Sequence, residues 1–164
     1  MHGADAPFWA HWLEASALGA WARQSTWGFA AANVLHLLGM AALLGSVLAF
    51  DLRVLGLRRA LPVAETGRLL LPLARGGFVL AIGSGLVLFS ADASHVYVNP
   101  AFQVKLLLIG LALLNVVAFH WLAPLAGSAA PGGAAPGIAA RVSAGLSLLM
   151  WPAVIVCGRM IAYL

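Results

Sequence analysis

Residues 26–50 read TWGFAAANVLHLLGMAALLGSVLAF, and this stretch decides the fold. It contains no Asp, Glu, Lys or Arg, and its one titratable side chain is His36. About 20 consecutive apolar residues suffice to cross a bilayer as a helix. Because the hydrocarbon offers no water to the backbone amides, such a segment must be helical. The stretch therefore predicts a membrane-spanning helix that carries one imidazole.

Three further segments of the same character follow, at 70–90, 102–122 and 142–164. The chain of 164 residues is 63% hydrophobic and 9% charged, and its mean hydropathy is +0.98. A soluble domain carries about 25% charged residues. We therefore expect an all-α integral membrane protein, in which residues 26–164 form an antiparallel bundle of four transmembrane helices. The bilayer is the predicted partner; nucleic acid is not, because the basic residues are dispersed.

The basic residues predict how the bundle is oriented. Six lie on one side of the expected membrane, namely Arg53, Arg58, Arg59, Arg68, Arg75 and Arg141. Three lie toward the other side, namely Arg23, Lys105 and Arg159. Loops rich in Lys and Arg remain in the cytoplasm. The loop 51–75 is therefore expected to be cytoplasmic, and both termini are expected to be periplasmic or exterior.

Residues 1–25 differ from the spans, because aromatic and polar residues are mixed there. Phe8 and Trp12 fall on one helix face over residues 6–23, which predicts an amphipathic helix at the outer interface, where Trp is favoured. The segment lacks the basic start and unbroken apolar core of a signal peptide. Near the other end of the chain, the Gly-, Ala- and Pro-rich stretch 126–140 predicts a flexible cytoplasmic linker.

Depth in the membrane separates the histidines. If the first span enters from the outer side near Thr26, His36 lies about 15 Å deep and Met40 about 6 Å deeper. His120, in the third span, lies about 27 Å deep by the same argument, so we do not expect it to share a ligand with His36. Titratable residues inside a membrane are functional candidates by default. The alternative for His36 is a neutral imidazole that is hydrogen-bonded to a neighbouring helix.

The leading hypothesis is a redox or electron-transfer subunit that binds b-type haem in the outer half of the bundle. The candidate cofactor-binding residues are His36, Met40, His95, Lys105, Arg159, Gly76 and Gly83. His36 is the expected axial ligand, with Met40 or His95 as the second contact. His95 reaches this layer only if the outer loop dips inward. The two cations would hold the propionates, and the two glycines would admit the ring.

Two other functions remain open on the same residues. Copper binding or translocation is one, because thioether and thiolate ligands suit Cu(I). Its candidate ligands are His36, Met40, Met150, Cys157 and Met160. A structural subunit without a cofactor is the other, because packing, snorkelling and close helix approach explain methionines, cations and glycines equally well. Expected partners are other membrane subunits or a periplasmic electron or metal carrier. With no nucleophile triad or phosphate loop visible, conventional hydrolysis is disfavoured.

Two segments of the chain resemble known membrane proteins. Residues 99–125, NPAFQVKLLLIGLALLNVVAFHWLAPL, resemble the signature of the copper-resistance D (CopD) type domain, with its early lysine at Lys105 and its asparagine at Asn115. Residues 36–57, HLLGMAALLGSVLAFDLRVLGL, resemble the H…G…G…DLR pattern of small, uncharacterised bacterial four-helix membrane proteins. A weaker similarity runs to HemJ-type protoporphyrinogen oxidases, which carry an intramembrane histidine and an early lysine in a later helix.

These resemblances cover roughly residues 26–122 and imply a place in a bacterial inner membrane. His36 matches the first-helix histidine and Lys105 matches the early lysine. The CopD resemblance implies copper passage or uptake, whereas the HemJ resemblance implies binding of b-type haem.

Overall fold

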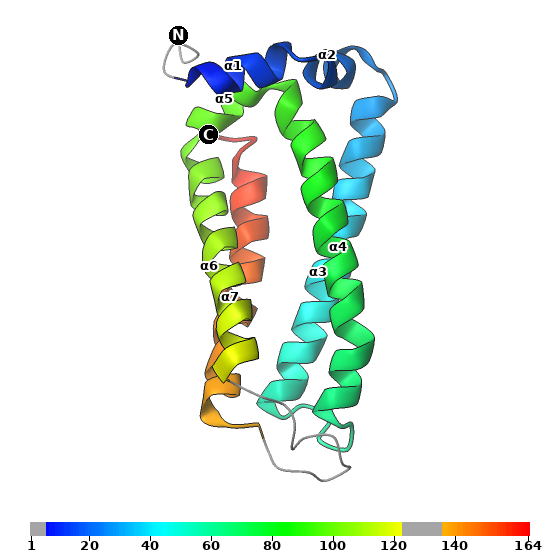
Figure 1. Ribbon diagram of the computed structural model, residues 1–164, viewed down its shortest axis with the longest axis vertical. Helices are drawn as coiled ribbons and strands as arrows, with labels where there is room; N and C mark the ends of the chain where they lie inside the picture. The colour runs from blue at the N-terminus through cyan, green and yellow to red at the C-terminus, as the bar shows by residue number, and fades with distance from the viewer. Residues whose placement is uncertain (1–5, 123–135) are drawn as a thin grey trace.

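A computed structural model describes residues 6–122 and 136–164. Four long helices dominate this part of the chain (Figure 1). They are α3 (Gly28–Leu55), α4 (Val63–Ala91), α6 (Pro100–Leu122) and α7 (Ile138–Met160). All four are long and apolar enough to cross a bilayer. The prediction of an all-α bundle is confirmed, and the protein is a multi-pass membrane protein.

The four helices form two antiparallel pairs, α3 with α4 and α6 with α7 (Figure 1). Packing between α3 and α7 joins the pairs. In contrast, the backbones of α4 and α6 make no contact with each other along their length. The bundle is therefore closed on the side of α3 and α7 and splayed on the side of α4 and α6.

Two glycines bring α3 and α4 close together. A Cβ added at Gly39 would lie 2.6 Å from the backbone nitrogen of Ala81, and one added at Gly77 would lie 2.6 Å from that of Leu43. Any larger residue would push the helices apart, as is usual where small residues mediate helix packing in membranes. This crossing places the backbone of α4 beside the residues of α3 that precede Gly39.

One half of the bundle is closed by a hydrophobic core, and we call this half the core end. The buried residues that define it are Phe50, Val54, Val63, Ala140 and Ala144. Phe119 of α6 packs edge-to-face on Phe50, with ring centroids 5.8 Å apart. Next to this core, the Ser143 hydroxyl donates to the Asn115 side chain at 2.9 Å, and the Asn115 amide donates to the Ser143 carbonyl at 3.0 Å.

Three short helices cover the other end of the bundle, which we call the cap end: α1 (Phe8–Ala15), α2 (Ala17–Gln24) and α5 (Ala93–Val98) (Figure 1). One amphipathic helix was predicted over 6–23, but the segment forms two helices, because the helix breaks at Ser16. Its hydroxyl donates to the Leu13 carbonyl and accepts from the Gly19 amide, which ends α1 and begins α2. Phe8 and Trp12 are exposed on the resulting cap.

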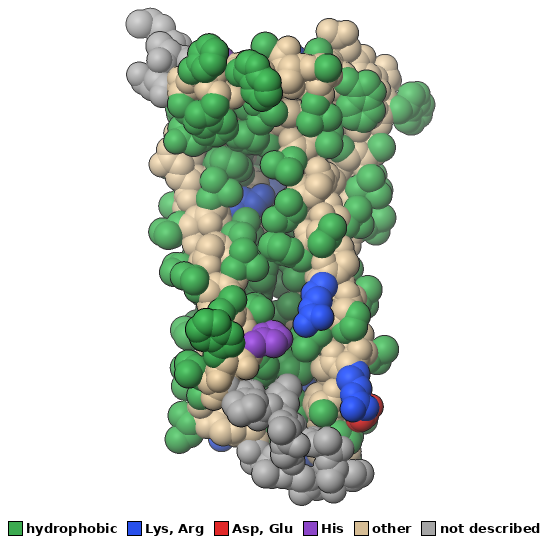
Figure 2. All heavy atoms as spheres, in the orientation of Figure 1, with side chains coloured by type: hydrophobic (Ala, Val, Ile, Leu, Met, Phe, Trp, Pro, Cys, Tyr) green, Lys and Arg blue, Asp and Glu red, His purple; other side chains and the backbone are tan. Residues whose placement is uncertain are grey.

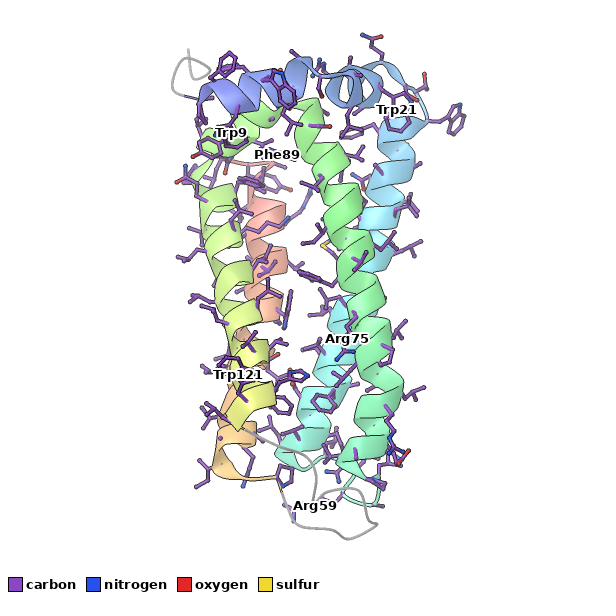
Figure 3. The ribbon with its side chains drawn as sticks, in the orientation of Figure 1. Trp9, Trp21, Arg59, Arg75, Phe89 and Trp121 are labelled. Atoms are coloured by element: carbon purple, nitrogen blue, oxygen red, sulfur yellow. The ribbon has the colours of Figure 1, made fainter. Side chains whose placement is uncertain are left out.

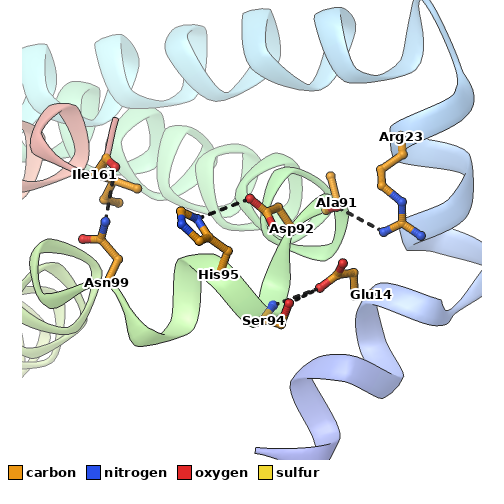
Figure 4. Close-up of polar contacts among 8 residues, drawn as sticks. All are labelled: Glu14, Arg23, Ala91, Asp92, Ser94, His95, Asn99 and Ile161. Atoms are coloured by element: carbon orange, nitrogen blue, oxygen red, sulfur yellow. Dashed lines mark hydrogen bonds and ion pairs between the residues drawn. The ribbon is translucent and has the colours of Figure 1, made fainter. Parts of the chain in front are cut away.

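Polar contacts fasten this cap to the bundle (Figure 4). The Glu14 carboxylate accepts from the Ser94 hydroxyl at 2.6 Å and from the Ser94 amide at 3.1 Å. Arg23 donates to the Ala91 carbonyl at 3.1 Å. Because that carbonyl belongs to the last residue of α4, the guanidinium satisfies a group that the helix end leaves without an intrahelical partner.

The helix ends differ from the limits expected from hydropathy. α3 continues past residue 50 to Leu55 and stops at Gly56, whose φ of 113° is a left-handed cap. α4 starts with a polar first turn that holds Glu65, seven residues before the expected apolar span. The stretch 126–140 lies mostly outside the described residues, and α7 already begins at Ile138. Hydropathy finds the apolar centre of a span, whereas turns and caps set its ends.

Candidate functional site

A cavity of about 460 Å³ lies in the half of the bundle next to the cap end, between α4 and α6. We call it the pocket. Its floor includes Leu43 of α3 and Trp151 and Val154 of α7. Its volume is within the range of about 300–1,000 Å³ that is typical of ligand sites. Figure 2 shows this face of the molecule hollowed and lined mainly with hydrophobic side chains.

His36 lines the pocket and is fixed by the neighbouring helix. Its Nδ1 lies 2.8 Å from the Ala81 carbonyl oxygen, which can only accept, so Nδ1 carries a hydrogen. The Ser84 hydroxyl lies 3.4 Å from the same nitrogen and itself donates to the Leu80 carbonyl. In the neutral imidazole, this tautomer leaves Nε2 with a lone pair, which can bind a metal or accept a proton. A backbone anchor of this kind also fixes the ring orientation of metal-binding histidines.

Gly85 provides the space that the imidazole occupies. A Cβ added at Gly85 would lie 3.0 Å from Cε1 and 3.3 Å from Nδ1 of His36. Gly85 and Met40 both line the pocket together with His36. Met40 comes from the same helix as His36, one turn further from the cap end.

Lys105 is the only lysine of the sequence, and it lines the pocket. It is half-buried in the second turn of α6, and its Nζ would lie 3.4 Å from a Cβ added at Gly158 of α7. The ammonium is therefore turned toward the neighbouring helix. Within residues 6–122 and 136–164 it makes no ion pair with a carboxylate. The pocket thus offers a positive charge to an anionic group.

Four aromatic side chains close the pocket toward the cap end, and we call them the aromatic roof: Trp9, Phe89, Tyr97 and Phe102. Phe89 and Phe102 stack in parallel with centroids 5.1 Å apart, and they join α4 to α6 where the backbones do not meet. Trp9 of α1 packs edge-on against Tyr97 at 5.0 Å and lies 6.3 Å from Phe89 (Figure 3). The roof therefore separates the pocket from the space beyond the cap.

Trp151 lines the pocket with its ring, whereas its indole nitrogen is buried within the protein. The side chain is 5% exposed, and its Nε1 has no hydrogen-bond partner among the described residues. Buried polar groups normally have a partner, and each exception needs an explanation. Because this nitrogen has almost no accessible surface, it does not face the pocket and indicates nothing about a ligand there.

The structure brings together three of the seven residues proposed for haem: His36, Met40 and Lys105. The other four lie away from the pocket. His95 is exposed on α5, with its Nδ1 3.6 Å from the Asp92 carboxylate. Arg159 is exposed and donates to the Tyr163 hydroxyl at 2.7 Å. Added Cβ atoms at Gly76 and Gly83 would meet nothing within 4 Å, and neither glycine lines the pocket.

The residues proposed for copper are more dispersed. His36 and Met40 line the pocket, whereas Met150 packs on the hydrophobic cluster that contains Leu43 and Trp151. Cys157 is half-buried and Met160 is 39% exposed. In the described part of the chain, no three His, Cys, Asp or Glu side chains gather at metal-binding range.

The aromatic roof and Trp151 were missed by the sequence analysis. A signal for part of the site exists on α4, where Phe78, Ile82, Gly85 and Phe89 recur at helical spacing and all line the pocket. Trp9 offers no such signal, because its place depends on how α1 packs against α5.

Comparison of the chain with known proteins found no matching family model, no matching curated protein and no matching solved structure.

Proposed function

We propose that this protein is a membrane subunit that binds b-type haem in the pocket and serves in electron transfer, with His36 as the axial ligand. The observation that carries this proposal is the anchored imidazole. The hydrogen bond to the Ala81 carbonyl leaves Nε2 available in a large apolar pocket. Histidine nitrogen is a common protein ligand of haem iron.

The remaining pocket residues suit the other parts of the same group. Aromatic and aliphatic side chains can cover a flat macrocycle, and Lys105 offers the charge that a propionate requires. Met40 lies on the helix that carries His36, and the facing residues Leu106 and Ile109 of α6 have no ligating atoms. The pocket therefore supplies one strong iron ligand from the protein. When bound, the group would supply one-electron chemistry, while the protein holds, orients and shields it.

The distribution of charge supports a periplasmic location for the cap end. Arg53, Arg58, Arg59 and Arg68 all lie near the core end, in and around the turn between α3 and α4. By the positive-inside rule, this end faces the cytoplasm and both chain ends face the periplasm of a bacterial inner membrane. A haem next to the cap end would then exchange electrons with a periplasmic carrier or with other membrane subunits.

An absorption spectrum with metal analysis of the purified protein tests the proposal. A Soret band that is lost in His36→Ala supports it, and Lys105→Gln is expected to retain haem less tightly. His120→Ala is the matched control, because His120 is exposed, bonded to its own helix at Val116, and outside the pocket. Stoichiometric copper without haem would support the copper hypothesis instead. A stable protein that binds neither would overturn the proposal in favour of a structural subunit.

A further inference from the structure

The pocket is closed toward both ends of the bundle. Toward the cap end the aromatic roof covers it, and the hydrogen bonds of Glu14 and Arg23 hold α1 and α2 in place above the roof (Figure 4). Toward the core end, Phe50 and its neighbours fill the interior. Neither water phase therefore has a direct path to His36 along the bundle axis.

The side between α4 and α6 is different. Ile82 and Leu86 of α4 and Leu106 of α6 line the pocket, yet they are 44%, 56% and 50% exposed. Side chains that belong both to a cavity and to the outer surface form its rim. Since the two backbones make no contact there, the rim is an opening that faces the hydrocarbon of the bilayer (Figure 2). We call it the lateral portal.

The chemistry of the lining limits what passes through this portal. Among the residues that the structure describes, Lys105 is the one charged side chain that lines the pocket, and nearly all the remaining lining is apolar. A strongly hydrophilic ligand would lose its hydration without replacement, at a cost of several kcal/mol for each unpaired polar group. An amphiphile with an apolar body and an acidic group matches both the apolar lining and the ammonium group of Lys105.

We infer that the pocket takes up a carboxylate-bearing amphiphile directly from the bilayer through the lateral portal, while the aromatic roof excludes the outer water phase. The carboxylate of this occupant complements the positive charge of Lys105. Its identification as haem depends on the proposed function, whereas the route depends only on the portal and the roof.

Fluorescence of Trp151 tests the route without any haem. In a variant whose other five tryptophans are replaced by Phe, Trp151 is the single emitter on the pocket floor. We expect quenching by phosphatidylcholine with brominated acyl chains, although the side chain is buried, and no quenching by iodide in the water. Leu86→Phe with Leu106→Phe narrows the portal and is expected to abolish most of the lipid quenching. Val79→Phe with Leu107→Phe is the matched control, because both residues are exposed outside the pocket.

The roof is tested in the same background by placing Ala instead of Phe at position 9. Iodide quenching is expected to rise in this variant while lipid quenching stays unchanged. Trp151 that is not quenched by brominated lipid would overturn the lateral route. Quenching by iodide in the background that keeps an aromatic ring, Phe, at position 9 would overturn the seal.

The rate of haemin binding then tests whether haem itself enters through the lateral portal. Haemin that is already dissolved in the vesicle membrane is expected to produce the Soret band several-fold more slowly in Leu86→Phe with Leu106→Phe, with an unchanged final spectrum. An equal rate in both proteins would contradict entry through the portal. If the wild-type chain binds no haemin at all, the proposed function fails, and the quenching result still decides the route.

Discussion

The core end and the pocket half of this bundle are built from the same four helices, yet one is filled and the other is hollow. At the core end, Ala140 and Ala144 of α7 let the helices close around Phe50 and Val54. Toward the cap end, Trp151 and the stack of Phe89 on Phe102 keep α4 and α6 apart. The filled half thus has small residues of α7 beside its large side chains, whereas in the hollow half α4 and α6 meet only through the stacked rings of Phe89 and Phe102.

The largest expected effect concerns the filled half. Phe50→Ala removes a ring that is 4% exposed and packed on Phe119, and the cavity is expected to cost about 3–5 kcal/mol of unfolding free energy. Phe78→Ala, at the pocket, should cost clearly less, because its ring already borders empty space. Denaturation by sodium dodecyl sulfate in mixed micelles, followed by circular dichroism, measures both. Equal losses would show that the two halves are packed alike.

The next effect concerns the close approach of α3 and α4 at Gly39. Gly39→Ala places a methyl group against the Ala81 backbone and is expected to cost about 1–3 kcal/mol. Gly45→Ala, on the same helix but in open space, should instead stabilise by up to about 1 kcal/mol through helix propensity. The same unfolding assay compares the two. If both substitutions changed the unfolding free energy in the same direction, α3 and α4 would not be in close contact at Gly39.

A smaller effect is expected for the polar pair of the core end. Asn115→Ala and Ser143→Ala should show a coupling energy of about 0.6 kcal/mol, and at most about 1.7, in a double-mutant cycle. Hydrogen bonds between membrane helices are weak because the unfolded chain also finds partners in the membrane. Additive losses would indicate that this pair does not join α6 to α7.

The smallest effect concerns the cap end and depends on pH. The hydrogen bond from the Ser94 hydroxyl is the main cause that holds the pKa of Glu14 below its ordinary value, against a raising contribution from burial. Because the folded pKa is the lower one, the contact stabilises the cap at neutral pH and is lost as the pH falls through that pKa. Amide exchange over residues 8–24 should accelerate there relative to Glu14→Gln. An identical pH profile in that variant would remove Glu14 as the cause.

The sequence predicts the depth of a residue along the bundle better than it predicts whether its side chain faces the pocket. Span assignment and helical rise select His36, Met40 and Lys105, and all three line one cavity. Gly76 and Gly83, which were expected to admit the ring, meet nothing across the bundle, whereas Gly85 touches the imidazole. In a membrane the lipid is as apolar as the protein interior, so hydrophobic periodicity does not reveal the buried face of a helix.

The parts that were not predicted depend on contacts between distant segments. The aromatic roof requires that Trp9 meets Phe89 and Tyr97, and no local pattern encodes a meeting between residues so far apart in the chain. His95 lies on a short helix, α5, where a loop was expected, and its side chain points to Asp92 rather than to the pocket.

The contacts of the cap have a consequence for biosynthesis. The partners of Arg23 and Glu14 lie 68 and 80 residues further along the chain, so α1 and α2 are synthesised well before the segments that fix them. Until α4 and α5 have been synthesised, Arg23 and Glu14 lack the hydrogen-bond partners that fix the cap. The exposed rings of Phe8 and Trp12 suit binding of α1 to the membrane surface during this interval, since aromatic side chains are favoured at the membrane–water interface. Trp9 can therefore close the roof of the pocket only after Phe89 and Tyr97 have been synthesised.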